Sequence, residues 1–129
     1  MRRHLSPETM PPPFGYSQVV DAPAGRIVYL SGQIPFDAEG ELVGEGDFEA
    51  QTHQVFRNLS AGLEAAGAGW SDVVKLTYYV VDVSRAASMR AIRDEYIDTE
   101  HPPASTLVQI GALFRPDVLI EVEAVAVVA

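Results

Sequence analysis

The sequence contains no cysteine in its 129 residues. A disulfide framework, a zinc-thiolate site and a thiol nucleophile are therefore excluded, and the composition is compatible with a reducing cytosol. Basic residues are also scarce, because 9 lysines and arginines stand against 18 aspartates and glutamates, a net charge of -9. Such an excess of negative charge repels phosphate backbones and anionic lipids, so we expect no nucleic-acid partner and no membrane partner.

Long apolar runs are absent as well, and none approaches the roughly 20 residues that a transmembrane helix needs. Residues 1–13 hold four prolines but no hydrophobic signal core, so they predict an extended N-terminal segment and a cytoplasmic protein. Hydrophobic residues make up 47% of the chain, which is typical of a packed globule. We expect a single domain over residues 14–129.

The first half of the chain predicts a hairpin followed by a helix. Turn chemistry at Ala22 to Gly25 separates a strand that ends at Asp21 from a strand over Arg26 to Ser31. Asp47 is a candidate N-cap, and Gly67 a candidate C-terminal stop, for a helix whose apolar or neutral positions recur at steps of three and four.

The second half predicts a strand over Asp72 to Val83, a helix capped by Ser84, and two strands over Ser105 to Leu113 and Val118 to Val128. The order β-β-α-β-α-β-β is typical of an α+β fold in which two helices pack on one face of a mixed sheet. The last strand is apolar on both faces apart from two acids, so we expect a partner subunit to cover the face that the helices leave open.

Common catalytic motifs are missing: the chain has no Walker loop, no G-x-G-x-x-G after a strand, no H-E-x-x-H and no EF-hand pattern. The three histidines, His4, His53 and His101, lie far apart in sequence and in three different local settings. We therefore expect no metal site.

Two short segments carry more information. Gly32, between Ser31 and Gln33 at the end of a predicted strand, marks either a β-bulge or the close approach of a ligand to the backbone. Glu121 and Glu123 alternate with apolar residues in the last strand and so share one face. The pair is either a solvated edge or a site in which desolvation raises the proton affinity of one carboxylate and makes it a general acid or base.

Several segments in fixed order carry a resemblance to a known family. They are Tyr16-Ser17-Gln18, Leu30 to Pro35, Glu49 to Thr52, Asn58-Leu59, Gly67 with Asp72 to Lys75, Pro103 to Thr106 and Ile120 to Ala124. Together they resemble the Rid family (RidA/YjgF, reactive-intermediate deaminases) over nearly the whole chain after Phe14. The resemblance implies a chorismate-mutase-like subunit that assembles as a homotrimer with a cleft between each pair of adjacent subunits.

The resemblance also implies a reaction, because family members hydrolyse enamines and imines such as 2-aminoacrylate to a 2-oxo acid and ammonia without a metal or cofactor. Such a reaction needs positioning, a proton shuttle and a place for the substrate carboxylate. By position, Glu121 would orient the attacking water and the backbone of Ser31 to Gln33 would line the pocket. Tyr16 would close the pocket, and the backbone of Thr106 would contact the substrate.

One position departs from the family pattern. Deaminating members carry an arginine immediately before the serine of an Arg-Ser pair, where it binds the substrate carboxylate as a bidentate fork; that position is Ala104 here. A hydrogen bond to a charged group contributes roughly 1.5 to 3 kcal/mol, so small 2-imino acids should bind one to two orders of magnitude more weakly. Arg90 is either a replacement cation or a surface arginine paired with a nearby acid such as Asp94.

The favoured expectation is a cofactor-independent enzyme that hydrolyses the C=N bond of a small-molecule enamine or imine, with its specificity shifted away from small 2-imino acids by Ala104. Two alternatives stay open. One is a non-catalytic homotrimer that binds a small metabolite, and the other is a dedicated hydrolase or tautomerase of a specialised pathway.

Overall fold

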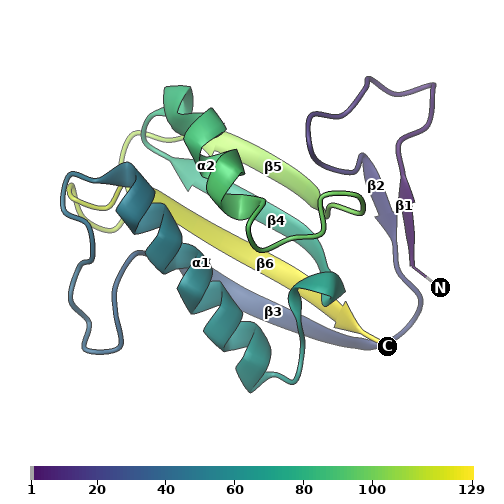
Figure 1. The fold of residues 1–129 in the computed structure, drawn as a ribbon, viewed down its shortest axis with the longest axis horizontal. Coiled ribbons are helices and arrows are strands. Elements are labelled where there is room, and N and C mark those ends of the chain that lie inside the picture. Colours follow the sequence, from purple (N-terminus) through teal and green to yellow (C-terminus); the bar gives the residue numbers. More distant parts are fainter. Residues whose placement is uncertain (1) are drawn as a thin grey trace.

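The computed structural model describes residues 2–129, and its two helices lie on one face of a four-stranded sheet (Figure 1). The order of the strands across the sheet is β3-β6-β4-β5; β6 is antiparallel to both of its neighbours, and β4 and β5 are parallel. The predicted α+β mixed sheet is therefore confirmed. The elements are α1 (Phe48–Ala65), α2 (Ala86–Arg93), β3 (Arg26–Gln33), β4 (Val73–Val80), β5 (Ala104–Gln109) and β6 (Ile120–Val128).

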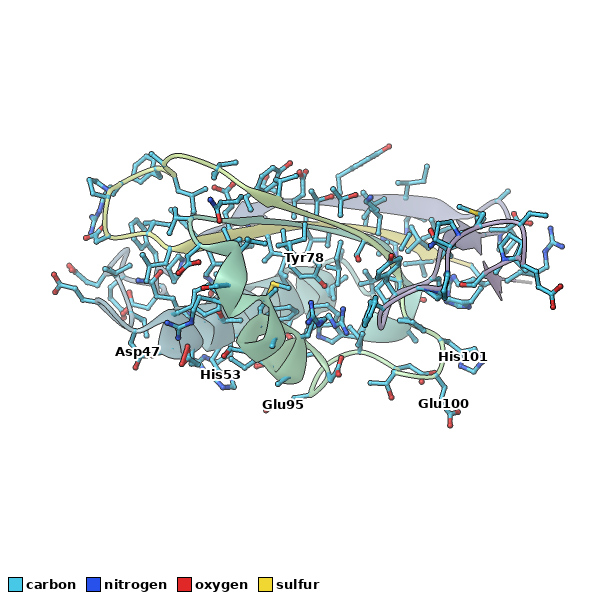
Figure 2. All side chains as sticks on the ribbon, turned by 90° about the horizontal axis from the view of Figure 1, so that it is seen from above. Asp47, His53, Tyr78, Glu95, Glu100 and His101 are labelled. Carbon is cyan, nitrogen blue, oxygen red and sulfur yellow. The ribbon has the colours of Figure 1, made fainter. Side chains whose placement is uncertain are left out.

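The hydrophobic core lies between the sheet and the helices, as the edge-on view of Figure 2 shows. Alternate residues of β6 are buried there, and α1 supplies side chains that are fully buried. Burial of a large apolar side chain contributes roughly 1.5 to 3 kcal/mol, so a one-residue slip of β6 would be very unfavourable. The β6 residues are Ile120, Val122, Ala124 and Ala126, and those of α1 include Val55, Phe56 and Leu59.

Helix α1 begins and ends as the sequence predicts. The Asp47 side chain accepts a hydrogen bond from the backbone N–H of Ala50 at 3.0 Å, which caps the helix. Gly67 follows the last residues of the helix with φ of +70°, a conformation that favours glycine.

Helix α2 begins differently from the prediction. Asp82, and not Ser84, provides the side-chain cap, because its carboxylate accepts from the backbone N–H and the hydroxyl of Ser84. A single 3₁₀ turn over Val83–Arg85 follows, and the α-helix starts at Ala86. Aspartate forms such local turns readily, which moves the start of the helical segment two residues toward the N-terminus.

The predicted N-terminal hairpin is wrong in its pairing. Strand β2 (Val19–Asp21) pairs with β1 (Arg3–Leu5) in a separate two-stranded ribbon beside the sheet, whereas β3 pairs with β6 (Figure 1). The turn at residues 22–25 predicts that β3 pairs with the strand just before it, β2. The long apolar strand β6 offers β3 a ladder that also buries Leu30, and this non-local burial decides the pairing.

The face of the sheet opposite the helices carries exposed apolar side chains within one chain. Tyr29 and Ile27 of β3 are 77% and 55% exposed. Neither helix covers this face (Figure 2). Within residues 2–129, neither helix has the length and hydropathy needed to cross a membrane.

Gln51 connects α1 to the chain that leads into β6. Its side chain is fully buried, its Nε2 donates to the carbonyls of Gly44 at 3.0 Å and Asp117 at 2.8 Å, and its Oε1 accepts from the N–H of Leu119 at 2.8 Å. Three backbone groups thus depend on one amide for their hydrogen bonds. The residue positions the start of β6, and with it the acids that follow.

We predict that Gln51→Ala lowers the free energy of unfolding by about 2 to 4 kcal/mol, because it leaves buried backbone groups unpaired. Urea unfolding followed by circular dichroism would measure the change. Arg57→Ala on the exposed side of the same helix is the matched control and should change stability by less than about 0.5 kcal/mol. Equal effects of the two substitutions would contradict the role assigned to Gln51.

Candidate functional site

Glu121 and Glu123 lie on an interior strand, so their interpretation as a solvated edge is wrong. Strand β6 is flanked by β3 and β4, and both acids point to the face that the helices leave open. Tyr79 of β4 stands opposite Glu121 in the ladder, and its hydroxyl donates to Glu123 Oε1 at 2.5 Å. Three polar side chains therefore meet on the helix-free face of the sheet.

The two carboxyl groups differ in their surroundings. Burial raises the pKa of Glu121, and the neighbouring charge of Glu123 raises that pKa further. Glu123 instead accepts the Tyr79 hydroxyl, and this hydrogen bond raises the pKa of Tyr79. A raised pKa brings the carboxyl of Glu121 closer to the range in which it can both accept and return a proton at neutral pH.

Gly32 lies directly against Glu121. The register of β3 against β6 shifts between Leu30 and Gln33, so the expected bulge is present. A methyl group on Gly32 would overlap the Oε2 atom of Glu121, so a larger residue there would displace this carboxylate. We call the open pocket around them, of about 230 Å³, the carboxylate pocket; its lining is Gly32, Tyr79, Ile110, Leu113, Glu121 and Glu123.

Tyr16 and Arg90 lie in a second pocket, of about 200 Å³, bordered by α2, β4 and β5. The two residues come from the segment before β2 and from α2, which is far along the chain. We call it the arginine pocket; its lining is Phe14, Tyr16, Tyr78, Met89, Arg90, Arg93, Ser105 and Leu107.

Arg90 does not pair with Asp94, so that part of the surface interpretation is wrong. The partner of Asp94 is Arg93, whose Nε and Nη2 donate to Asp94 Oδ1 at 3.1 and 2.8 Å. No ion pair within residues 2–129 occupies the Arg90 guanidinium. Its charge is therefore available at the pocket.

Strand β5 brings different residues to the arginine pocket from those expected. Ser105 and Leu107 line it, so by alternation the side chains of Ala104 and Thr106 point to the other face of the sheet. The Thr106 hydroxyl accepts from Lys75 Nζ at 2.6 Å there. The resemblance predicts that Ala104 lines the substrate pocket. The direction of the side chains along β5 shows instead that Ser105 lines the arginine pocket.

Of the segment Ser31 to Gln33, only Gly32 lines the carboxylate pocket. Ser31 and Gln33 line a groove between β3 and α1 with Asn58 and Gly62, and Gln33 Nε2 donates to the carbonyl of Ser31 at 3.1 Å. At the bulge, the residues on either side of Gly32 therefore line a different pocket from Gly32 itself.

The two pockets open on opposite faces of the sheet. Tyr78 of the arginine pocket lies between the sheet and the helices (Figure 2), whereas its neighbour Tyr79 lines the carboxylate pocket on the other face. Within one chain, Tyr16 and Arg90 therefore do not meet Glu121.

Two histidines that are distant in sequence are neighbours in the structure. The rings of His4 and His101 make an edge contact with centroids 5.5 Å apart, and His101 Nδ1 lies 3.0 Å from Asp98 Oδ2. The expectation of three separate settings is wrong for this pair. Asp98, Glu100 and His101 hold possible metal ligands within 4.8 Å of one another, and all three residues are exposed.

Comparison with known proteins gives consistent matches along almost the whole chain. Residues 8–128 match the family described as endoribonuclease L-PSP. A RutC family protein of Pyrococcus horikoshii is 42% identical over 128 residues, and a 2-iminobutanoate/2-iminopropanoate deaminase of Salmonella typhimurium is 39% identical over 131 residues. The crystal structure of a Rid family protein from Yersinia pestis matches with a TM-score of 0.87 at 40% identity. Each match covers 98% of both chains.

We predict that Glu123→Gln lowers the pKa of Glu121. The substitution removes the neighbouring charge and keeps the size of the side chain, but the burial that is the larger cause of the shift remains. The pKa should therefore fall toward its ordinary value without reaching it. Titration of ¹³C-labelled glutamate carboxyls by NMR would measure it, with Glu64→Gln on α1 as the control. An unchanged or higher pKa of Glu121 in Glu123→Gln would refute the coupling.

Proposed function

The chain belongs to the RidA/YjgF (Rid) family, and from that premise we propose that it hydrolyses a reactive enamine or imine to a carbonyl compound and ammonia. The observation that carries the proposal is the half-buried Glu121, with a raised pKa, held against the backbone of Gly32 in an open pocket. The relative named 2-iminobutanoate/2-iminopropanoate deaminase supports the same class of reaction.

Every step of the proposed reaction is a proton transfer or the addition or loss of a small molecule. An enamine first takes a proton on carbon and loses one from nitrogen, which gives the imine. Glu121 then accepts a proton from water as the water oxygen forms a bond to the imine carbon, and it passes this proton to the nitrogen, which gives a carbinolamine. Glu121 next takes the proton of the new hydroxyl group and returns it to the nitrogen as the C–N bond breaks, so that ammonia leaves and the carbonyl group forms. A carboxyl with a raised pKa suits this role because it both accepts and returns the proton.

We assign the complete site to an interface between subunits of a homotrimer. Tyr16 and Arg90 lie in the arginine pocket and Gly32 and Glu121 in the carboxylate pocket, on opposite faces of the sheet, so one chain cannot bring them around a single small molecule. A neighbouring subunit against the helix-free face would bring its arginine pocket to the carboxylate pocket. The exposed side chains of Tyr29 and Ile27 give that face an apolar surface for contact.

The proposed substrate is larger or less anionic than 2-aminoacrylate. Strand β5 contains no arginine, so the bidentate carboxylate anchor of deaminating relatives is missing from it. The available cation is Arg90, which lines the arginine pocket from α2. Small 2-imino acids would lose the β5 contact and have little apolar surface to compensate for it.

A second candidate is a trimer that binds a metabolite without converting it, and the missing β5 arginine is what favours it. Under this reading Glu121→Ala leaves ligand affinity unchanged and there is no turnover to lose. A third candidate, a hydrolase or tautomerase dedicated to one intermediate, differs from the first in accepting only one substrate.

The proposal predicts release of ammonia from imines formed in situ by an amino-acid oxidase, at rates above spontaneous hydrolysis. Gly32→Ala should lower kcat/KM by about 100-fold, because the added methyl displaces the Glu121 carboxylate from the reacting carbon. Gly69→Ala is the matched control, since a methyl group there meets nothing within 4 Å. Competition with semicarbazide, which traps imines, would measure the rates.

The outcome that would end the proposal is a rate equal to background for imines of small, branched and aromatic amino acids alike. Activity that survives in Glu121→Gln would leave hydrolysis possible but remove Glu121 from it.

We predict a solution mass three times the 14.0 kDa of one chain at micromolar concentration. Tyr29→Glu places a charge on the helix-free face and should dissociate the assembly, because burying an unpaired charge is very unfavourable. Arg57→Glu on the exposed side of α1 is the control and should leave the mass unchanged. Light scattering would measure it, and a monomeric wild-type protein would refute the interface.

A further inference from the structure

The hydroxyl of Tyr78 is buried, and no group among residues 2–129 accepts a hydrogen bond from it. Tyr78 points from β4 toward the helices, lines the arginine pocket, and is 1% exposed. Burial raises its pKa to about 12, so the hydroxyl keeps its proton at any working pH. A buried hydroxyl without an acceptor destabilises a fold, and native structures rarely retain one without a reason.

Arg93 is the charged group beside this hydroxyl, and its positive charge and a hydrogen bond from its side chain oppose part of the rise in the pKa of Tyr78 that burial causes. Its side chain is 4% exposed and also lines the pocket. Nε and Nη2 of Arg93 donate to Asp94, which leaves Nη1 for another partner. A guanidinium carries donors only, so Arg93 cannot accept the proton of Tyr78. The Tyr78 hydroxyl therefore lies beside a guanidinium with its own proton unpaired, since none of residues 2–129 accepts it.

The rest of the pocket describes the ligand that would supply that acceptor. Arg90 adds a positive charge with no ion pair among the described residues, which favours a carboxylate over a neutral carbonyl. Met89 and Leu107 give apolar walls, and Phe14 extends them outward. Pockets of this kind, mostly apolar with a few polar groups, hold the polar end of a ligand in one place and its apolar body against the walls.

We propose that Tyr78 is a specificity-determining residue, which donates a hydrogen bond to the carboxylate of a 2-imino acid beside Arg90 and Arg93. The apolar side chain of that substrate, of branched-chain or aryl size, packs on Met89 and Leu107. The choice of an imino acid rests on the function proposed above. Residues of β4 and α2 would then bind the carboxylate. A substrate with a methyl-sized side chain would not make the apolar contacts.

The test uses 4-methyl-2-oxopentanoate, a stable 2-oxo acid with a branched side chain, and calorimetry on the full-length protein. Wild type should bind it at least tenfold more tightly than pyruvate, because pyruvate lacks the side chain that packs on the walls. Tyr78→Phe should bind it about tenfold or more weakly than wild type does. Binding of 4-methyl-2-pentanone, which has the apolar body but no carboxylate, should be equal in the two proteins.

Thermal melting separates this role from a structural one. Tyr78→Phe removes a hydroxyl whose proton has no acceptor among residues 2–129, so its Tm should equal or exceed that of wild type. Tyr96→Phe is the matched control: Tyr96 stacks on Phe56 with centroids 5.2 Å apart, does not line the pocket, and should not affect binding. A lower Tm of Tyr78→Phe than of Tyr96→Phe would mean that a structural partner satisfies the hydroxyl, and the proposal would be wrong.

The remaining outcomes are also decisive. Absence of oxo-acid binding to wild type, equal affinity for pyruvate, or equal affinity of Tyr78→Phe would each overturn the inference. Hydrolysis of imines that Tyr78→Phe leaves unchanged would do the same while the proposed reaction stands. Conversely, oxo-acid binding that depends on Tyr78 without turnover of any imine would support the carboxylate site and end the proposal of hydrolysis.

Discussion

The burial of one face of β6 against the two helices is the constraint on which the rest of the site depends. Ile120, Val122, Ala124 and Ala126 enter the core, and because side chains alternate along a strand, Glu121 and Glu123 must lie on the opposite face. Strand β6 itself lies between β3 and β4, so neither acid is on an edge strand of the sheet. The acids are therefore half-buried, close to each other and close to a tyrosine, and burial together with the charge of Glu123 raises the pKa of Glu121.

The same alternation divides the proposed machinery between two faces. Neighbouring residues of β4 show it directly, since Tyr78 enters the arginine pocket and Tyr79 enters the carboxylate pocket. In the proposed reaction, a single subunit would thus hold the proton carrier on one side of the sheet and the anion-binding pocket on the other. An assembly that places one subunit's carboxylate pocket against another's arginine pocket joins them, and it also covers the apolar helix-free face. Catalysis and association would then depend on one interface, which links substrate specificity to quaternary structure.

The arginine pocket shows how a binding function can move from one element to another. Strand β5 offers Ser105 and Leu107 to the pocket and no cation, while α2 offers Arg90 and Arg93. Asp94 occupies two nitrogens of Arg93 and leaves Arg90 unpaired within residues 2–129. Donors then outnumber acceptors around Tyr78, and that imbalance, rather than any single residue type, is the basis on which we propose that the pocket binds an anion with an apolar body.

Local patterns in the sequence were enough to predict the limits of α1, the order of the helices and strands from β2 onward, and the shared face of Glu121 and Glu123, but they did not predict β1 within residues 1–13. These features depend on residues within a few positions of one another, through capping, helical spacing and alternation. Only the tertiary structure decided that β2 pairs with β1, that Asp94 binds Arg93, that Ser105 rather than Ala104 faces Arg90, and that His4 meets His101. Each of these depends on which distant segments are brought together by burial of apolar surface. The hydroxyl of Tyr78 depends most on the tertiary structure, because the lack of an acceptor for its proton can be recognised only when the positions of all neighbouring residues are known.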